Sequence, residues 1–246
     1  MHSPFLFELL PFVHDRERHY YVFDEIEGLR NELLHDHKEI ELLDYGAGSR
    51  TRHSRTVADI AGSSLTPVPR CRVIFRLITH LKPGNILEIG TSLGITTAYL
   101  AAAHCDTTVH TIEGNPALTE IARQIACEMD LRNITFHTGR FAEVLPELIK
   151  QVPSPGFILI DGDHRGEALL SYYQMLKPGL LTHTVIVIDD IRWSADMYDT
   201  WRKIIQDPDV TCILDYFSFG VLLFRKDFRN KLHLKIIPGR WPPQVL

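Results

Sequence analysis

Apolar residues recur through the second two thirds of the chain as short runs separated by amphipathic stretches. The runs predict strands at residues 85–90, 107–112, 133–137, 156–161 and 184–189. The stretches between them show helical spacing, at residues 94–104, 116–129, 141–150 and 165–176. Nearly continuous apolar runs are typical of a parallel sheet that helices cover on both faces. The pattern therefore predicts an α/β fold.

The pattern changes after residue 189. A predicted helix at 194–206 is followed by a strand at 210–217 and a second one that begins near Phe219 and ends near Arg225. Two strands joined by so short a link must pair antiparallel. The prediction is a Rossmann-like, doubly wound sheet of seven strands, parallel except for a C-terminal antiparallel hairpin.

The N-terminal part has a different pattern. Residues 15–37 predict one or two amphipathic helices, and residues 68–80 predict another, with apolar residues along one stripe. We expect a mostly helical extension over residues 1–65 that caps the substrate site, and a cofactor-binding domain over residues 66–246.

The segment from Asp44 to Gly48 resembles a nucleotide-binding turn. A polar, basic segment follows it instead of an apolar helix or a second strand. A turn places a ligand only when its strand and helix hold it, so we expect a structural loop here, with a lid or substrate contact as the alternative.

Composition narrows the class of protein. The chain has 246 residues, 45% of them hydrophobic, which suits one large α/β domain with an extension, or one and a half domains. Its formal net charge of −5 argues against a general nucleic-acid binder. Four widely spaced cysteines, no membrane-spanning run and no secretory signal predict a cytoplasmic protein with reduced thiols. A homodimer is one option for its assembly.

Charge is unevenly distributed near the N-terminus. Residues 1–46 are rich in Asp and Glu, whereas the segment from Arg50 to Lys82 carries seven basic residues and Asp59 alone as an acid. The two interpretations are a solvated helix face that pairs with the acidic arm, and a patch that steers an anionic substrate.

The turn after the first predicted strand has the spacing Glu88-x-Gly90-x-x-x-Gly94, with Thr91 and Ser92 inside it. A dinucleotide fingerprint places a pyrophosphate at a helix N-terminus, but Glu88 would repel that anion. A ligand with an ammonium group and no phosphates suits the turn. S-adenosyl-L-methionine (SAM) fits that description.

Two further positions extend this prediction. Glu113 ends the second strand, nineteen residues after Gly94, where a carboxylate can accept hydrogen bonds from both ribose hydroxyls. Arg140 and Phe141 follow the third strand, where Phe141 either stacks on the adenine ring or starts a helix.

Carboxylates follow the fourth and fifth strands. The fourth strand is followed by Asp161, Asp163 and His164, and the fifth by Asp189 and Asp190. These ends are neighbours in an open parallel sheet, and crowded carboxylates there need a cation or protons. Mg²⁺ or a similar divalent cation bound by Asp161, Asp189 and Asp190 is one solution, and helix capping by Asp163 and Asp190 is the alternative.

Together these motifs resemble the class I SAM-dependent methyltransferases, over about residues 66–226. The similarity is strongest to the metal-dependent O-methyltransferases that act on catechols, caffeoyl-CoA and antibiotic sugars. It implies that the methionine part of SAM lies near Glu88, Gly90 and Ser92, that Glu113 binds ribose, and that three aspartates bind the metal. Asp190 stands where the catechol type has Asn, and His164 stands where that type has its lysine base, so a catechol substrate is not implied.

The expected function is O-methylation of a small-molecule hydroxyl, with Asp163 or His164 assisting proton removal. An anionic acceptor would suit the basic segment, and no nucleic-acid or membrane partner is expected. The alternatives are a metal-independent N-methyltransferase acting on protein or RNA, and a non-catalytic SAM-binding protein.

Overall fold

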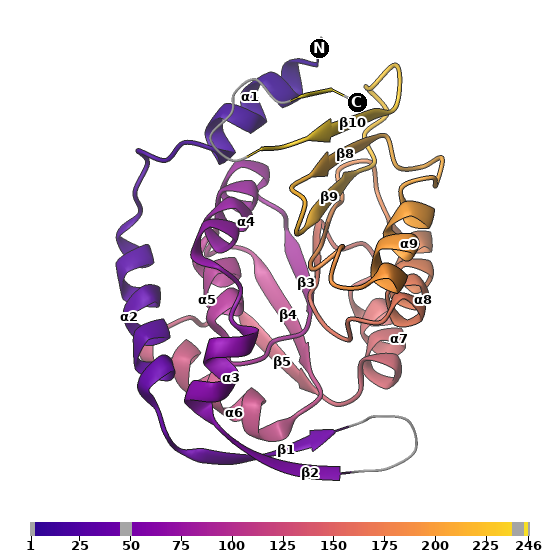
Figure 1. Ribbon diagram of the computed structural model, residues 1–246. Coiled ribbons are helices and arrows are strands. Elements are labelled where there is room, and N and C mark those ends of the chain that lie inside the picture. The colour runs from indigo at the N-terminus through magenta and orange to yellow at the C-terminus, as the bar shows by residue number, and fades with distance from the viewer. Residues whose placement is uncertain (1–2, 45–50, 238–243, 246) are drawn as a thin grey trace. The chain divides into compact units, whose positions relative to one another are not determined.

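A computed structural model describes residues 3–44, 51–237 and 244–245 of the chain (Figure 1). The chain forms two compact units. Unit 1 comprises residues 1–84 and 91–144, and unit 2 comprises residues 85–90 and 145–246. The division of the chain at residue 66 stays a prediction.

Unit 2 contains most of the strands. They are β3 (Asn85–Ile89), β6 (Phe157–Ile160), β7 (Val185–Ile188), β8 (Cys212–Asp215), β9 (Gly220–Leu223), β10 (Leu232–Lys235) and β11 (Gln244–Val245). Their hydrogen-bonded order is β11-β10-β8-β9-β7-β6-β3. β3, β6 and β7 pair parallel, and β9 pairs antiparallel with both β7 and β8. The predicted antiparallel hairpin is therefore confirmed, with its second strand inserted beside β7.

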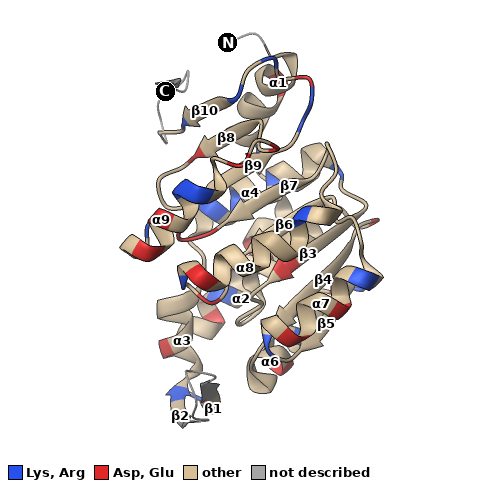
Figure 2. Cartoon of the chain, turned by 90° about the vertical axis from the view of Figure 1, so that its right-hand side faces the viewer, with Lys and Arg blue, Asp and Glu red and all other residues tan. Residues whose placement is uncertain are grey.

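Helices connect the strands of unit 2. They are α8 (Gly166–Leu176), the short 3₁₀ helix η1 (Lys177–Gly179), α9 (Ala195–Ile204), and α7 (Phe141–Gln151), which begins in unit 1. Ser194 caps α9 by accepting the N–H of Met197 at 3.1 Å. α9 has Asp196 in its first turn and basic residues in its last turn (Figure 2), the order that the helix dipole favours. The sequence predicted α7, α8 and α9 within two residues of their ends, whereas η1 was not predicted as a helix.

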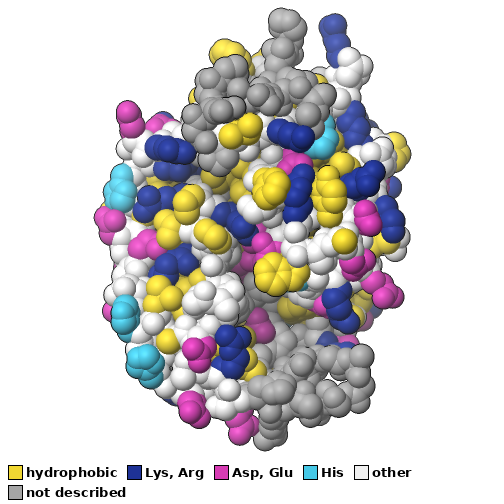
Figure 3. Space-filling view, viewed as in Figure 1, with side chains coloured by type: hydrophobic (Ala, Val, Ile, Leu, Met, Phe, Trp, Pro, Cys, Tyr) yellow, Lys and Arg dark blue, Asp and Glu magenta, His cyan; other side chains and the backbone are white. Residues whose placement is uncertain are grey.

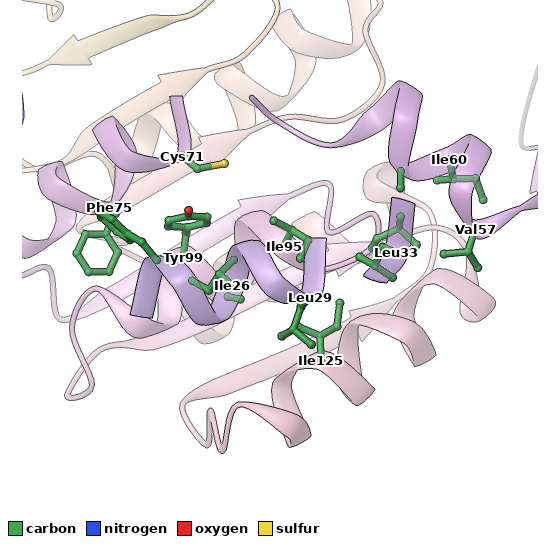
Figure 4. Packing of buried hydrophobic residues seen from close by; sticks show 14 of the residues in the cluster. Ile26, Leu29, Leu33, Val57, Ile60, Cys71, Phe75, Ile95, Tyr99 and Ile125 are labelled. Carbon is green, nitrogen blue, oxygen red and sulfur yellow. The ribbon is translucent and has the colours of Figure 1, made fainter. Parts of the chain in front are cut away.

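Unit 1 contains the parallel pair β4 (Thr108–Glu113) and β5 (Ile134–Thr138) together with helices α5 (Ile95–Ala102) and α6 (Pro116–Glu128). Its N-terminal helices are α1 (Pro4–Val13), α2 (Tyr21–His35), α3 (Val57–Ser64) and α4 (Val68–Leu81). The rings of Phe23 and Phe75 lie 4.9 Å apart at their centroids. These rings belong to a buried cluster that also contains Tyr99 and Ile125 and takes residues from α2, α3, α4, α5 and α6 (Figure 4).

The N-terminal extension also contains strands, which the sequence interpretation missed. β1 (Glu39–Asp44) pairs antiparallel with β2 (Thr51–Thr56). The expectation that no second strand follows Asp44 is thus wrong, because β2 has the sequence TRHSRT and carries no apolar alternation to reveal it. The rest of the turn expected as a loop, residues 45–48, lies outside the described residues.

No helix in the described part of the chain is both long and apolar enough to cross a membrane. On the face seen in Figure 3, basic side chains are interspersed with acidic and apolar ones.

The end of β8 is held by a buried ion pair. Asp215 is 4% exposed and accepts hydrogen bonds from Arg192 Nη1 at 2.9 Å, from Arg192 Nη2 at 2.7 Å and from the N–H of Phe217 at 2.8 Å. Although burial opposes its charge, His233, Arg192 and Phe217 together hold the pKa of Asp215 below its ordinary value.

We expect Asp215→Asn to lower the free energy of unfolding by about 3 kcal/mol at neutral pH, because it leaves the Arg192 charge without its partner. A carboxylate with a lowered pKa stabilises the fold above its unfolded pKa, about 3.9, and this contribution is lost as the pH falls further. Urea unfolding of the wild type and of Asp215→Asn should therefore show a difference in the free energy of unfolding that shrinks below pH ~4. Asp227→Asn, which breaks the exposed pair with Arg225, is the control and should cost less than about 1 kcal/mol. An equal loss in both variants would contradict the assignment.

Candidate functional site

The predicted site residues fall into two groups, one in each unit, and each group is described separately. Unit 1 holds the second part of the glycine turn and the end of β4. Unit 2 holds the first part of the turn and the ends of β6 and β7.

In unit 1 the turn closes on the end of β4. The N–H of Thr91 donates to the carbonyl of Ile112 at 3.2 Å, and the N–H of Gly94 donates to the carbonyl of Thr91 at 3.0 Å. Gly94 has φ +87°, and a Cβ there would lie 2.7 Å from the Cβ of Ala122. Only glycine therefore lets α5 begin so close to α6.

Glu113 lies at the centre of this group. It is 9% exposed, and its carboxylate accepts the N–H of Ser92 at 2.8 Å and the N–H of Asn115 at 2.9 Å. Burial raises the pKa of Glu113, against the effect of these N–H donors. Each carboxylate oxygen can accept a second hydrogen bond, so the group retains capacity for a ligand's hydroxyls.

The residues after β5 are less enclosed. Arg140 is exposed and pairs with Glu143 at 3.6 Å between Nη1 and Oε1. Phe141 is half-buried and begins α7, so the predicted helix start is observed. The cofactor roles of Arg140 and Phe141 stay predictions.

In unit 2 three strand ends lie side by side. The N–H of Asp161 donates to the carbonyl of Ile89, and the N–H of Asp189 donates to the carbonyl of Ile160, both at 2.9 Å. Glu88 is fully buried in β3, in register with Leu159 of β6. These ladders bring the ends of β3, β6 and β7 to one edge, as predicted for a parallel sheet.

Gly90 fits against this edge at very close range. Its φ is +109°, and a Cβ there would lie 2.3 Å from the carbonyl oxygen of Asp161. No side chain can be accommodated at such a distance, so the turn requires glycine at this position.

His164 lies between two of the predicted aspartates. Its Nδ1 is 3.2 Å from Asp190 Oδ2, and its Nε2 is 3.8 Å from Asp161 Oδ1. Asp190 raises the pKa of His164 first by its hydrogen bond and then by its charge, with Asp189 and Asp163 adding to the effect and burial opposing it. Asp189 is 5% exposed and accepts the N–H of Asp190 at 2.8 Å.

Asp163 has other partners. Its carboxylate binds both Arg165 Nε, at 2.5 Å, and Arg165 Nη2, at 2.7 Å, and accepts the hydroxyl of Tyr172 at 3.2 Å. The structure therefore groups His164 with Asp161 and Asp190, whereas Asp163 is held in a separate ion pair. Neither Arg165 nor Tyr172 was singled out from the sequence, since neither belongs to a motif.

The aspartates match a divalent cation in the kind of donor they offer. Three carboxylates are the oxygen ligands that Mg²⁺ prefers. As placed, however, they do not form a group of three ligand atoms within 4.8 Å of one another; in the described part of the chain only the consecutive residues His104, Cys105 and Asp106 do. The metal stays a prediction.

Comparisons with known proteins agree with this geometry. Residues 87–191 match a family model described as a methyltransferase domain. This range begins in β3 and ends just after the Asp189–Asp190 pair, so it contains every predicted site residue. No curated protein matches the sequence of the chain.

Solved structures share the fold at low sequence identity. The SAH-bound methyltransferase PaMTH1 from Podospora anserina has a TM-score of 0.63 and 12% identity, covering 92% of this chain and 97% of that one. The O-methyltransferase TomG from Streptomyces achromogenes, in complex with SAM, has a TM-score of 0.59 and 20% identity, covering 66% and 82%. An O-methyltransferase from Bacillus cereus in complex with SAH has a TM-score of 0.60 and 19% identity, covering 84% and 92%.

These likenesses confirm the predicted α/β, Rossmann-like fold. The family match agrees with the resemblance to methyltransferases that the turn, Glu113 and the aspartates had indicated, and the metal-dependent branch stays a prediction. Residues 87–191 are similar in sequence to methyltransferase domains.

Proposed function

We propose that the chain transfers a methyl group from SAM to a hydroxyl of a small molecule, with a divalent cation held by Asp161, Asp189 and Asp190. The observation that carries the proposal is the group of His164, Asp161, Asp189 and Asp190 at the strand ends of one methyltransferase domain. When bound, the cation would lower the pKa of the acceptor hydroxyl and orient its oxygen.

The protein's own residues have distinct roles in this proposal. Gly90, Thr91, Ser92 and Gly94 shape the turn for the methionine part of SAM, beside Glu88, and Glu113 binds the ribose. His164 accepts the acceptor's proton at Nε2 while Asp190 holds Nδ1, at 3.2 Å. Asp163 is the weaker candidate for this role because both its oxygens already bind Arg165. The remaining rate enhancement comes from holding donor and acceptor in line.

Two measurements test the proposal. Calorimetric titration with S-adenosylhomocysteine, with and without Mg²⁺, tests cofactor and metal together. A panel of phenols, sugars and acyl-CoA esters, assayed for S-adenosylhomocysteine formation, tests the reaction class and whether anionic acceptors are favoured. Activity that survives chelation would support the metal-independent N-methyltransferase instead, and binding without turnover on any acceptor would support a non-catalytic protein.

Glu113→Gln should weaken S-adenosylhomocysteine binding at least tenfold, a loss of about 1.4 kcal/mol or more. The amide has one acceptor oxygen, whereas the carboxylate receives two N–H groups and would also serve two ribose hydroxyls. Calorimetric titration measures the loss, and Glu120→Gln, an exposed position on α6, is the control. Unchanged affinity in Glu113→Gln would remove Glu113 from the site.

A further inference from the structure

We propose that unit 1 contains a second binding site, for a phosphate group, formed by the guanidinium groups of Arg72 and Arg76 on α4. Both residues belong to the basic segment for which an anionic substrate was one of the two interpretations of the sequence. The site is separate from the residues proposed to bind SAM, and the proposal does not depend on the reaction.

Both arginines have donor capacity left over at a buried Nε. Arg76 is 6% exposed; its Nη2 donates to the carbonyl of Arg18 at 2.8 Å, and its Nε is buried without a hydrogen-bond partner. Arg72 is half-buried, and its Nε is likewise buried without a partner. Among the described residues, neither arginine forms an ion pair with a carboxylate.

The nearby carboxylates are already engaged elsewhere. Glu27 pairs with Arg30 at 2.8 Å between Oε2 and Nε, and its Oε1 accepts the hydroxyl of Tyr99 at 2.8 Å. Asp15 lies 3.5 Å from Arg18 Nε and also accepts the N–H groups of Glu17 and Arg18. Among the described residues, neither guanidinium group on α4 therefore has a carboxylate within ion-pair distance, although the charge of Asp15 still acts on Arg76.

One aromatic ring holds the two cations near each other. The guanidinium carbon of Arg72 lies 4.9 Å from the centroid of the Phe23 ring, and that of Arg76 lies 5.8 Å from the same centroid. The ring attracts each cation but cannot neutralise their mutual repulsion. The pKa of Arg76 is lowered, mainly by burial and further by the charges of Arg72 and Arg18, whereas Tyr20 and Asp15 act to raise it.

The positive charge of Arg76 also acts on a neighbouring histidine. His14 lies close enough for Arg76 and Arg16 to lower its pKa, after the larger effect of burial. Neighbouring positive charges that no carboxylate pairs with directly are costly to bury, so a bound anion would stabilise this arrangement.

The ligand chemistry follows from the number of charges and donors. Two guanidinium groups present paired N–H donors that match tetrahedral oxyanions, and together they carry two positive charges. A phosphate dianion or phosphate monoester balances both, whereas a monocarboxylate leaves one charge unbalanced.

The test is calorimetric titration of the full chain with inorganic phosphate and with phenyl phosphate, at constant ionic strength, with acetate as the monovalent comparison. We expect phosphate to bind at least tenfold more tightly than acetate. Tighter binding of phenyl phosphate would identify an organic phosphate as the ligand, and equal binding would identify free phosphate. Absence of measurable binding by both, or equal binding of phosphate and acetate, would overturn the proposal.

Variants locate the site. Arg76→Leu and Arg72→Leu should each weaken phosphate binding at least tenfold, and Arg72→Lys, which keeps the charge but loses the paired donors, should weaken it less. Arg132→Leu is the matched control, because that side chain is exposed and paired with Asp130. Circular dichroism and S-adenosylhomocysteine titration show whether each variant is folded and whether the proposed SAM site is intact. Unchanged phosphate binding in both leucine variants would place the anion elsewhere.

Discussion

Replacing Gly90 with alanine should lower the free energy of unfolding by about 3–5 kcal/mol, the range of the most damaging single substitutions. The backbone at Gly90 has φ +109°, where an L-residue is strained. The new Cβ would also lie 2.3 Å from the carbonyl oxygen of Asp161 and 2.7 Å from its carbonyl carbon. Both are backbone atoms, and Asp161 is itself held by its hydrogen bond to Ile89, so the overlap cannot be relieved by a side-chain rotation.

Two other glycines provide controls for this experiment. The Cβ that Gly84→Ala adds has no atom within 4 Å, so this variant should change the free energy of unfolding by less than about 0.5 kcal/mol. Gly28→Ala, inside α2 and also in open space, should stabilise by about 0.5–1 kcal/mol through helix propensity. Urea unfolding measures all three. A Gly90→Ala protein as stable as Gly84→Ala would show that the turn does not approach Asp161 as described.

Strands with a strong apolar signal could be predicted from the sequence. β6 and β7 are the apolar runs FILI and VIVI, buried along their whole length, and their partners are similar runs. β10, with the sequence LHLK, was missed because it is short and lies in a charged tail. Its place is set by parallel pairing with β8, a contact that no local pattern encodes.

Helix α1 was missed for a different reason. Its segment contains prolines at both Pro4 and Pro11, which argue against a helix when they are counted without regard to position. Pro4 in fact occupies the first turn, where proline is favoured, and Ser3 caps the helix by accepting the N–H of Leu6. Pro11 lies inside the helix, so the favourable position applies to Pro4 alone.

In the candidate site, the sequence predicted the position of residues along the strands but not the contacts of their side chains. The sequence places Asp161, His164 and Asp190 at neighbouring strand ends because strand ends are readable from apolar runs. It does not reveal that Arg165 holds Asp163, or that His164 lies between two aspartates, since both depend on side-chain conformations. Spacing thus predicted which groups share an edge, and the structure adds which of them interact.

The proposed metal site has its sharpest test at Asp189. Asp189→Ala should lower Mg²⁺-dependent turnover at least about 100-fold, because removing a ligand should cost no less than removing an outer-shell partner of a metal site. S-adenosylhomocysteine affinity should stay within about threefold, or roughly 0.65 kcal/mol, since Asp189 is not among the residues proposed to bind SAM. Steady-state assays of S-adenosylhomocysteine formation over a range of Mg²⁺ concentrations measure the first quantity, and calorimetry measures the second.

The buried position of Asp189 requires a control for folding. Asp189 is 5% exposed and accepts the N–H of Asp190, so its loss also removes a local support of the turn after β7. Asp189→Asn keeps an acceptor oxygen for that N–H but offers a weaker ligand, so it should fold like the wild type and still need far more Mg²⁺. Asp199→Ala, an exposed residue of α9, should leave turnover and its Mg²⁺ dependence unchanged. Two results would show that the proposed cation is wrong: wild-type turnover in both Asp189 variants, or full activity of the wild type after chelation. In that case the carboxylates would serve only to stabilise His164 and the strand ends.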